Sequence, residues 1–355
     1  MGVVSCRLQP QLPMHAIHFL WQHVTRPPWR TIYACLGLAL LTCAAYALWS
    51  PGESATDGRH DLRTNGIWMQ HGWLGADAWF QENGRDPSLF RHTDRLLPMA
   101  ALFNEHGIRD VFPHLCPCAS DGAISPVDAK QTERFLDAFA GFRVIPWIGG
   151  VHLTHCRPNH EGWRKTFISS TLELLNRHPR LAGVQINIEP MPSGEPSLIT
   201  LLQEMKSALP AGKILSVAAY PPPTRWHPHP DIHWEEAYFR EVANHCDHLA
   251  VMAYDTALRW EKPYQRLMAD WTQEILTWAG ETPVLIGIPA YDDAESGYHH
   301  PDVENPVNAF AGLHAGLLRF PKLPASYLGM ALYSDWEMTA TEWETVKAQF
   351  GKRNP

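Results

Sequence analysis

Two hydrophobic patterns alternate along most of the chain: short apolar runs of strand type, and longer segments with apolar residues three or four positions apart. The strand-type runs span residues 66–73, 108–115, 143–150, 182–189, 214–220, 248–254, 284–291 and 327–334. The helical segments include residues 128–142, 163–179, 197–209, 234–246, 264–280 and 308–320.

Eight such units predict an α/β fold of the (β/α)8 TIM-barrel type. An open doubly wound sheet is the alternative. It is disfavoured because the chain has neither a G-x-G-x-x-G motif after its first strand nor a phosphate loop. Prolines cluster directly after several strands, for example at 190–192 and 221–223. In a barrel these positions form the C-terminal mouth, where enzymes of this fold keep their chemistry.

A long apolar run precedes the first strand. Residues 31–49, TIYACLGLALLTCAAYALW, carry no charge and have about the length that crosses a bilayer core. The arginines of residues 1–30 precede the run and the next basic residue is Arg59, so we expect a cytoplasmic N-terminus and a periplasmic or extracellular domain. The run therefore predicts a transmembrane signal anchor. A signal peptide cleaved after residues 45–47 is the alternative.

These features divide the chain into a cytoplasmic tail (1–30), the anchor (31–49), a polar linker (50–64) and a (β/α)8 domain (65–355). A domain of about 300 residues is at the upper range for a single core. After residue 50 the chain holds 26 Lys and Arg against 37 Asp and Glu, a net charge of −11. This balance argues against a nucleic-acid partner or an anionic lipid surface.

The fourth strand-type run, LAGVQINIEP (181–190), carries the strongest candidate chemistry. Side chains alternate between the two faces of a strand, so Gln185, Asn187 and Glu189 share the face that lines a barrel lumen. Pro190 follows at once and favours an extended Glu189 at the strand end. A carboxyl group with little water around it has a raised pKa and can act as an acid. A polar strand end that only hydrogen-bonds to loops is the alternative.

This run resembles the fourth strand of glycoside hydrolase family 18, whose pattern is D-G-x-D-x-D-x-E. Gly183 and Glu189 match the family's glycine and catalytic acid, whereas Ala182, Gln185 and Asn187 stand where the family has aspartates. The Asn-x-Glu pair is similar to that of the related family 85.

Three further motifs follow the family's order. WIGG (147–150) is similar to S-x-G-G, with Trp147 in place of serine, and MAYD (252–255) is similar to M-x-Y-D. GMALYSDWE (329–337) resembles the eighth strand, with Tyr333 where the family usually has a tryptophan floor. Their order and spacing are more specific than any single match.

The resemblance implies a hydrolase without cofactor or metal that uses a substrate-assisted, retaining mechanism, an exception to the paired-carboxylate scheme. The 2-acetamido group of an N-acetylhexosamine attacks its own anomeric carbon, and Glu189 acts as acid and then as base. Asn187 orients the acetamido group and Tyr254 donates a hydrogen bond to it. Because an amide brings no negative charge to an oxazolinium cation, we expect weaker stabilisation unless a neutral oxazoline forms.

A two-carboxylate mechanism is the second chemistry to consider. Asp255, at the end of the sixth strand, is its best nucleophile or base. Asp292, Asp335 and Glu337 follow strands seven and eight, where capping of loops is the ordinary role of a carboxylate.

Aromatic residues gather at strand ends, where a flat ring suits the C–H face of a pyranose. The expected substrate-binding residues are Trp68, Trp147, Gln185, Tyr220, Tyr333 and Trp336. His71 is the one histidine that we also consider for a substrate contact.

Four cysteines lie beyond the anchor, at positions 116, 118, 156 and 246. Two of Cys116, Cys118 and Cys156 are expected to form a disulfide in an oxidising compartment. A metal site built from HLCPC (114–118) and VHLTHC (151–156) is an alternative, but C-x-C is not the spacing of a zinc knuckle. Unpaired thiols are the third reading.

Together these features predict a membrane-tethered, exported glycoside hydrolase that acts on a glycan or polysaccharide containing N-acetylhexosamine. Two other functions fit the same sequence: a catalytically inactive glycan-binding barrel, and an accessory protein of polysaccharide synthesis or export. Which proteins it contacts is left open by the sequence.

Overall fold

The computed structural model describes residues 29–227 and 229–351. The chain divides into two compact units after Ser50. The cytoplasmic tail expected at residues 1–30 lies outside the described residues, apart from its last two positions, where the first described helix begins.

That helix is α2 (Trp29–Leu48). Its segment Thr31–Leu48 has a mean hydropathy of 1.8 and is long and apolar enough to cross a membrane. Large apolar side chains such as Leu38, Leu40 and Leu41 are exposed on it. A signal sequence near the N-terminus would have the same length and composition, so the helix fits either an anchor or a cleaved leader.

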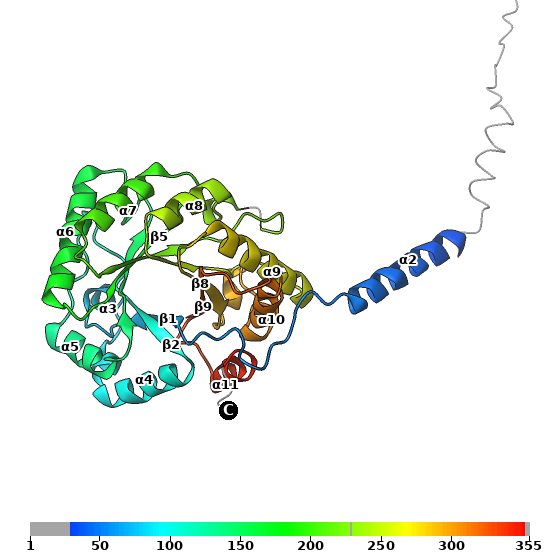
Figure 1. The fold of residues 1–355 in the computed structure, drawn as a ribbon, viewed down its shortest axis with the longest axis horizontal. Coiled ribbons are helices and arrows are strands. Elements are labelled where there is room, and N and C mark those ends of the chain that lie inside the picture. Colours follow the sequence, from blue (N-terminus) through cyan, green and yellow to red (C-terminus); the bar gives the residue numbers. More distant parts are fainter. Residues whose placement is uncertain (1–28, 228, 352–355) are drawn as a thin grey trace, which may run out of the picture. The chain divides into compact units, whose positions relative to one another are not determined.

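The second unit is a closed barrel of parallel strands surrounded by helices (Figure 1). Its strands are β1 (Asn65–His71), β2 (Ile108–His114), β3 (Arg143–Val144), β4 (Trp147–Val151), β5 (Gly183–Glu189), β6 (Ile214–Ala219), β7 (His248–Val251), β8 (Val284–Pro289) and β9 (Tyr327–Tyr333). Strand β1 pairs with both β2 and β9, which closes the barrel. The predicted (β/α)8 barrel is thus confirmed, and β3 and β4 together form its third strand, interrupted at Ile145 and Pro146.

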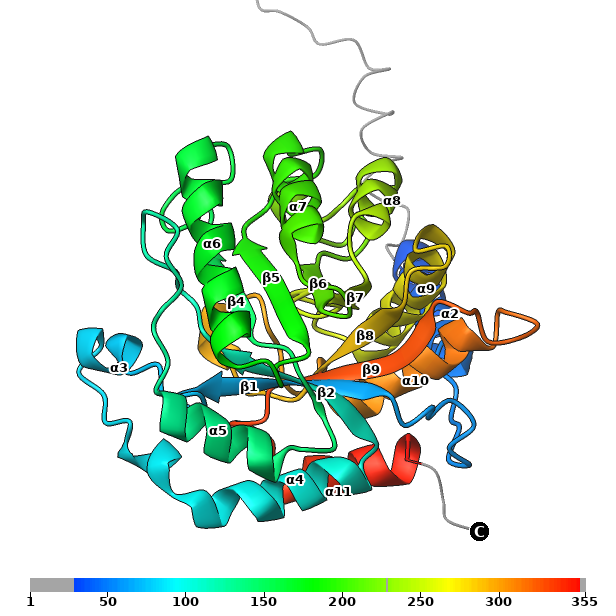
Figure 2. The ribbon, with the colours of Figure 1, turned by 60° about the vertical axis from the view of Figure 1, so that its left-hand side comes forward.

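Helices alternate with the strands and cover the outside of the barrel (Figure 2). They are α3 (Ala78–Glu82), α4 (Leu96–Glu105), α5 (Ala129–Ala138), α6 (Glu161–Arg177), α7 (Pro196–Ala208), α8 (Glu236–Asn244), α9 (Glu261–Trp278), α10 (Pro306–Leu317) and α11 (Ala340–Gln349). Short 3-10 turns are η1 (Ser88–Arg91), η2 (Thr93–Arg95), η3 (Pro230–Ile232) and η4 (Ala294–Ser296). The six helical segments expected from the sequence correspond to α5 through α10.

Several helix starts follow from local sequence. Asp128 accepts a hydrogen bond from the backbone N–H of Gln131 at the start of α5. Thr339 and Glu342 form a capping box at α11, in which each side chain bonds to the other's backbone N–H. Such caps satisfy N–H groups that have no partner within the helix.

Alternation along β5 separates the two sides of the barrel wall. Val184, Ile186 and Ile188 belong to the apolar core between strands and helices. A second apolar cluster fills the lumen and includes Trp68, Phe112, Ile145, Leu285 and Ala331. The lumen is therefore packed, and the mouth of the barrel is left for a site.

The segment expected to form a linker spans residues 50–64, and from Pro51 onward it belongs to the same compact unit as the barrel. The Nδ1 atoms of His60 and His314 lie 2.7 Å apart, and the Tyr327 hydroxyl donates to the His60 carbonyl at 3.0 Å. Ala55, His60 and Asp61 are buried. The polar side chains and backbone groups of this segment serve as hydrogen-bonding groups of the folded domain.

Candidate active site

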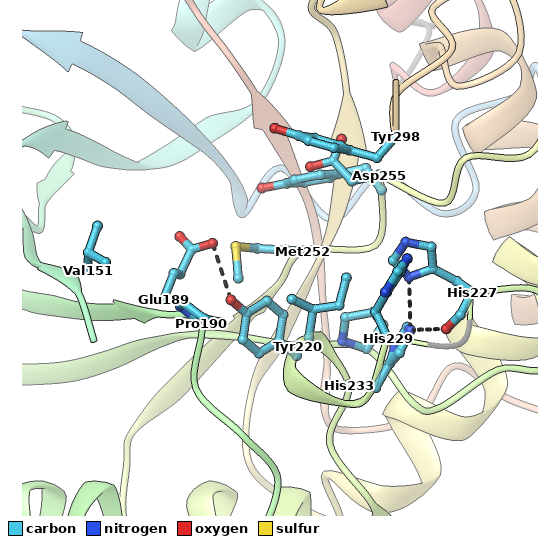
Figure 3. Close-up of a pocket in the computed structure, with 13 residues that line it drawn as sticks. Val151, Glu189, Pro190, Tyr220, His227, His229, His233, Met252, Asp255 and Tyr298 are labelled. Carbon is cyan, nitrogen blue, oxygen red and sulfur yellow. Dashed lines mark hydrogen bonds between the residues drawn. The ribbon is translucent and has the colours of Figure 1, made fainter. Parts of the chain in front are cut away.

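Glu189 ends β5 and faces a cavity at the mouth of the barrel (Figure 3). Its Oε1 accepts a hydrogen bond from Asn187 Nδ2, and its Oε2 accepts one from the Tyr220 hydroxyl at 3.3 Å. Burial raises the pKa of Glu189; these two hydrogen bonds oppose the rise, and the negative charge of Asp255 adds to it. A carboxyl group with a raised pKa keeps its proton closer to neutral pH, as a general acid requires.

Asn187 is buried beside Glu189, with 5% of its surface exposed. Its Oδ1 has no hydrogen-bond partner among the described residues. Most buried polar atoms in folded proteins are paired, because an unpaired one loses its water without compensation. The Asn187 carbonyl oxygen is thus an acceptor with unused capacity next to the candidate acid.

Gln185 lies deeper on the same strand and is fully buried. Its Oε1 accepts a hydrogen bond from Trp68 Nε1 at 2.7 Å, and its Nε2 donates one to Ser216 Oγ at 3.1 Å. Trp68 is itself only 1% exposed. These two expected substrate-binding residues therefore lie beneath the cavity and bond to each other.

The polar contacts of Gln185 continue across the lumen. His248 Nδ1 lies 2.7 Å from Ser216 Oγ, and His248 Nε2 lies 3.4 Å from Asp110 Oδ2. Asp110 also pairs with Arg143. Burial acts to raise the pKa of Asp110, but hydrogen bonds from His248 and Arg143 outweigh it and hold the pKa well below its usual range. Sequence patterns do not indicate this chain of contacts, because its members come from separate strands.

Tyr254 and Asp255 follow β7 on another side of the cavity. Burial raises the pKa of Tyr254, so its hydroxyl stays protonated, and no described residue bonds to it. Asp255 accepts a hydrogen bond from the Tyr291 hydroxyl, and its Oδ1 lies 3.3 Å from His299 Nδ1. The backbone of Asp255 has φ 61°, which is uncommon for a residue other than glycine.

A buried acid–base pair lies behind Asp255. His299 Nδ1 is 4.0 Å from Glu304 Oε2, and Glu304 accepts the backbone N–H of Thr256 at 2.9 Å. Burial acts to lower the pKa of His299, but Asp255 and Glu304 outweigh it and raise the pKa. Burial raises the pKa of Glu304 to about 7. Neither His299 nor Glu304 belongs to a sequence motif that would predict a place in the site.

Tyr333 occupies the centre of an aromatic floor. Its ring centroid lies 5.1–6.4 Å from those of Trp68, Trp147, Tyr254, Tyr291 and Trp336. The Tyr254 ring is stacked on it at 19°. Contacts of this kind hold rings rigidly, so the floor beneath the cavity is preformed.

Two cavities meet at Glu189. The first, of about 440 Å³, extends from Val151 and Glu189 to a cluster of histidines (Figure 3). The second, of about 500 Å³, lies toward β1, β2 and β4 and is lined by Trp147 and Asn187 as well as Val151 and Glu189. The candidate acid is thus accessible from both.

The remaining expected residues divide between these cavities and the loops. Tyr220 lines the first cavity, and His71 and Trp147 line the second. Trp336 donates from Nε1 to Glu337 at 3.1 Å and borders the aromatic floor.

Two of the alternative carboxylates, Asp335 and Glu337, bond to backbone N–H groups. Asp335 accepts the backbone N–H of Gln70 at 2.9 Å, and Glu337 accepts that of Asp292 at the same distance. Burial raises the pKa of Asp335 to about 7. Of the four acids considered for a two-carboxylate mechanism, Asp255 is the one that lines the first cavity.

The structure brings two of the three candidate cysteines together. The Sγ atoms of Cys118 and Cys156 lie 3.6 Å apart, both buried and without a covalent bond. Cys116 Sγ instead lies 3.6 Å from the Trp147 carbonyl oxygen. Among residues 29–227 and 229–351, no three His, Cys, Asp or Glu side chains are arranged to hold a metal ion.

The sequence model of glycosyl hydrolases family 18 matches residues 120–350, more than half of the chain. No curated protein sequence matches it.

Solved structures share the fold at low sequence identity. A chitinase from Chromobacterium violaceum has a TM-score of 0.52 and 17% identity, over 81% of this chain and 99% of that one. The spore cortex-lytic enzyme SleL of Bacillus cereus has a TM-score of 0.51 and 11% identity, over 81% and 74%. A fungal endo-beta-N-acetylglucosaminidase from glycosyl hydrolase family 18 has a TM-score of 0.51 and 12% identity, over 82% of this chain and 98% of that one.

Proposed function

The chain belongs to glycosyl hydrolases family 18, and on this premise we propose that it hydrolyses a glycan containing N-acetylhexosamine, with Glu189 as general acid and base. The observation that carries the proposal is the pairing of Glu189 with Asn187, whose buried Oδ1 has no partner among the described residues. The names of the fold neighbours, a chitinase and an endo-beta-N-acetylglucosaminidase, fit this substrate class.

Asn187 and Tyr254 offer complementary groups to a 2-acetamido substituent. The unpartnered Oδ1 of Asn187 accepts the acetamido N–H, and the Tyr254 hydroxyl donates to the acetamido carbonyl. Together they turn the carbonyl oxygen toward the anomeric carbon of its own sugar. Holding two reacting atoms in this way removes much of the entropic cost of the attack.

Glu189 supplies and then recovers one proton. Its O–H protonates the glycosidic oxygen while the bond from that oxygen to the anomeric carbon breaks, and the acetamido oxygen bonds to the carbon to give an oxazolinium ion that keeps its N–H proton. A water molecule then gives a proton to Glu189 and attacks the anomeric carbon, which reopens the oxazolinium ring and restores the neutral acetamido group. Two inversions at one carbon give retention.

The neutral Asn187 leaves the positive charge of the intermediate without a carboxylate on that side. Asp255 is the carboxylate besides Glu189 that lines the first cavity, and Tyr291 and His299 fix its position. A carboxylate held by such bonds needs little reorganisation as charge develops. We assign Asp255 to electrostatic support and not to nucleophilic attack.

The proposal places this domain outside the cytoplasm, tethered through α2. The apolar segment Thr31–Leu48, with arginines only on its N-terminal side until Arg59, supports that orientation.

Turnover by the full chain tests the function. The protein is incubated with a panel of N-acetylhexosamine polymers, and both binding and new reducing ends are measured. Glu189→Gln is expected to lower turnover about 10³-fold or more while leaving binding intact. Glu344→Gln, an exposed carboxylate on α11, is the matched control. Full activity of Glu189→Gln would overturn the assignment of Glu189 as the acid. Binding without new ends in the unaltered protein would overturn hydrolysis in favour of a glycan-binding barrel.

A further inference from the structure

The cavities at the barrel mouth join into one groove. The first and second share Val151 and Glu189. A third cavity of about 530 Å³ shares His227, His229 and His233 with the first. We call these three cavities the groove; Glu189 lies within its length and not at a closed end.

The charges that line the groove are all negative among the described residues. The five carboxylates are Glu82, Glu189, Asp231, Glu235 and Asp255, and no lysine or arginine lines the described part of the three cavities. Glu82, Asp231 and Glu235 are exposed, and no described residue forms an ion pair with any of them. They lie in the outer cavities, on opposite sides of Glu189.

Four of the six histidines that line the groove have a lowered pKa and do not offset this charge near neutral pH. Burial lowers the pKa of His71 and of His227 to about 4. It also lowers the pKa of His114 and of His233. These imidazoles are therefore neutral hydrogen-bonding groups.

Two arginines come near the groove without lining it. Arg85 lies over the Trp79 ring, 5.2 Å from its centroid, and Arg225 lies over the Trp226 ring at 4.7 Å. Neither arginine is a lining residue, although Trp79 lines the groove and the Arg85 charge contributes to lowering the pKa of His71.

Unpartnered neutral atoms provide a second sign of a polar ligand. Asn187 Oδ1, Trp147 Nε1 and His233 Nδ1 have no hydrogen-bond partner in the described chain. These three residues are 4–7% exposed and line the groove. Neutral donors and acceptors suit the hydroxyl and amide groups of a sugar.

We propose that the groove takes a partly de-N-acetylated polymer of an amino sugar and that Glu189 cuts it within the chain. An N-acetylated unit occupies the site at Glu189, as the proposed function requires, and ammonium groups of neighbouring units face Glu82 on one side and Asp231 and Glu235 on the other. The same charges disfavour polymers that carry uronic acids or other carboxylates, because like charges repel across an interface.

Binding by the Glu189→Gln protein tests this inference separately from turnover. The probes are oligomers of β-1,4- and β-1,6-linked glucosamine with about half of their units acetylated, each compared with its own chemically re-acetylated form. Exposed ion pairs each contribute modestly, so three of them predict roughly tenfold tighter binding of the de-N-acetylated form at low salt. The preference should shrink as salt screens the charges.

Charge-neutral variants locate the effect. Adding Glu82→Gln, Asp231→Asn and Glu235→Gln together should abolish the preference, whereas adding Glu344→Gln should leave it unchanged. Equal binding of both forms, absent binding, or a preference that survives the triple substitution overturns the inference. A retained preference in Glu189→Gln, with no new reducing ends from any acetylated polymer in the unaltered protein, overturns the proposed function instead.

Discussion

The indole N–H of Trp68 donates a 2.7 Å hydrogen bond to Oε1 of Gln185 beneath the floor of the cavity. The amide of Gln185 donates in turn to Ser216. An ionised aspartate, as in the family pattern at this position, accepts hydrogen bonds but donates none. The Gln185 amide therefore has a structural role in the barrel interior, where it both accepts and donates a hydrogen bond. Its presence in place of an aspartate does not by itself indicate that catalysis is lost.

Gln185→Leu should destabilise the protein. It leaves the Trp68 N–H buried without an acceptor and removes a partner of Ser216, which we expect to lower the free energy of unfolding by about 2–4 kcal/mol. Denaturant titration measures the change. Gln203→Leu, an exposed position on α7, should stay within about 0.5 kcal/mol. Equal stability of the two variants would contradict a structural role for the Gln185 amide.

Two substitutions of Asn187 should separate its role in orienting the acetamido group from the effect of a negative charge at this position. Asn187→Ala removes the acceptor for the acetamido group and should lower kcat on the order of 10²-fold. Asn187→Asp places a second carboxylate beside Glu189, which raises the pKa of Glu189 because like charges disfavour ionisation. A general acid works protonated, so the alkaline limb of the kcat profile should move to higher pH. A profile that stays in place in Asn187→Asp argues against Glu189 as the acid.

Tyr220→Phe should also move the alkaline limb of the kcat profile to higher pH, by a smaller amount than Asn187→Asp. The Tyr220 hydroxyl bonds to Glu189 at 3.3 Å and lowers its pKa, so removing it raises the pKa and extends activity to higher pH. Tyr238→Phe is the control, because its hydroxyl donates to the Glu195 carbonyl. The pH dependence of kcat is measured for both, and a shift toward lower pH in Tyr220→Phe would refute the assignment.

Asp335→Asn should stabilise the protein more at pH 8 than at pH 5. Burial raises the pKa of Asp335 from its ordinary 3.8 to about 7. A raised pKa favours the neutral form in the fold, so its contribution is full below pH 3.8 and is lost as the pH rises through about 7. The amide keeps an acceptor for Gln70. The variant should gain about 1–3 kcal/mol over the unaltered protein at the higher pH, measured by denaturant titration. An equal difference at both pH values would rule this out.

Cys118 and Cys156 should form a disulfide when the domain folds in an oxidising compartment. Their thiols lie 3.6 Å apart, and pairing gives two protons and two electrons to a thiol–disulfide oxidant. The bond should raise the free energy of unfolding by about 2–4 kcal/mol over the reduced protein. Thiol titration of denatured, unreduced Cys118→Ser, with Cys246→Ser as control, checks the pairing. Free thiols at both positions in unreduced protein would exclude it.

Periodicity was sufficient to predict the barrel, because strand and helix patterns alternate clearly. It did not reveal α4 (Leu96–Glu105), whose sequence LLPMAALFNE is apolar on several sides and carries Pro98 in its first turn, where proline is tolerated. Nor did it show that the third strand is divided at Pro146.

At the site, alternation along β5 was enough to single out Asn187 and Glu189, since both lie on the lumen face near the strand end. The alternation could not predict that Asn187 and Glu189 lie at the cavity while Gln185 lies beneath it. That difference depends on how Trp68 packs across the barrel. His299 and Glu304 could not be predicted from the sequence. Their proximity to Asp255 arises only when the loop that follows β8 folds.

The position of Glu189 within the groove has a physical consequence for a solution of long chains. An enzyme that removes units from an end shortens each molecule slowly, whereas one that cuts anywhere along a chain sharply reduces the mean length with the first few events. Because viscosity depends steeply on chain length, a solution of the proposed polymer would lose most of its viscosity while few reducing ends had been released. In a hydrated matrix, the same early cuts would turn a gel into a fluid before appreciable sugar was set free.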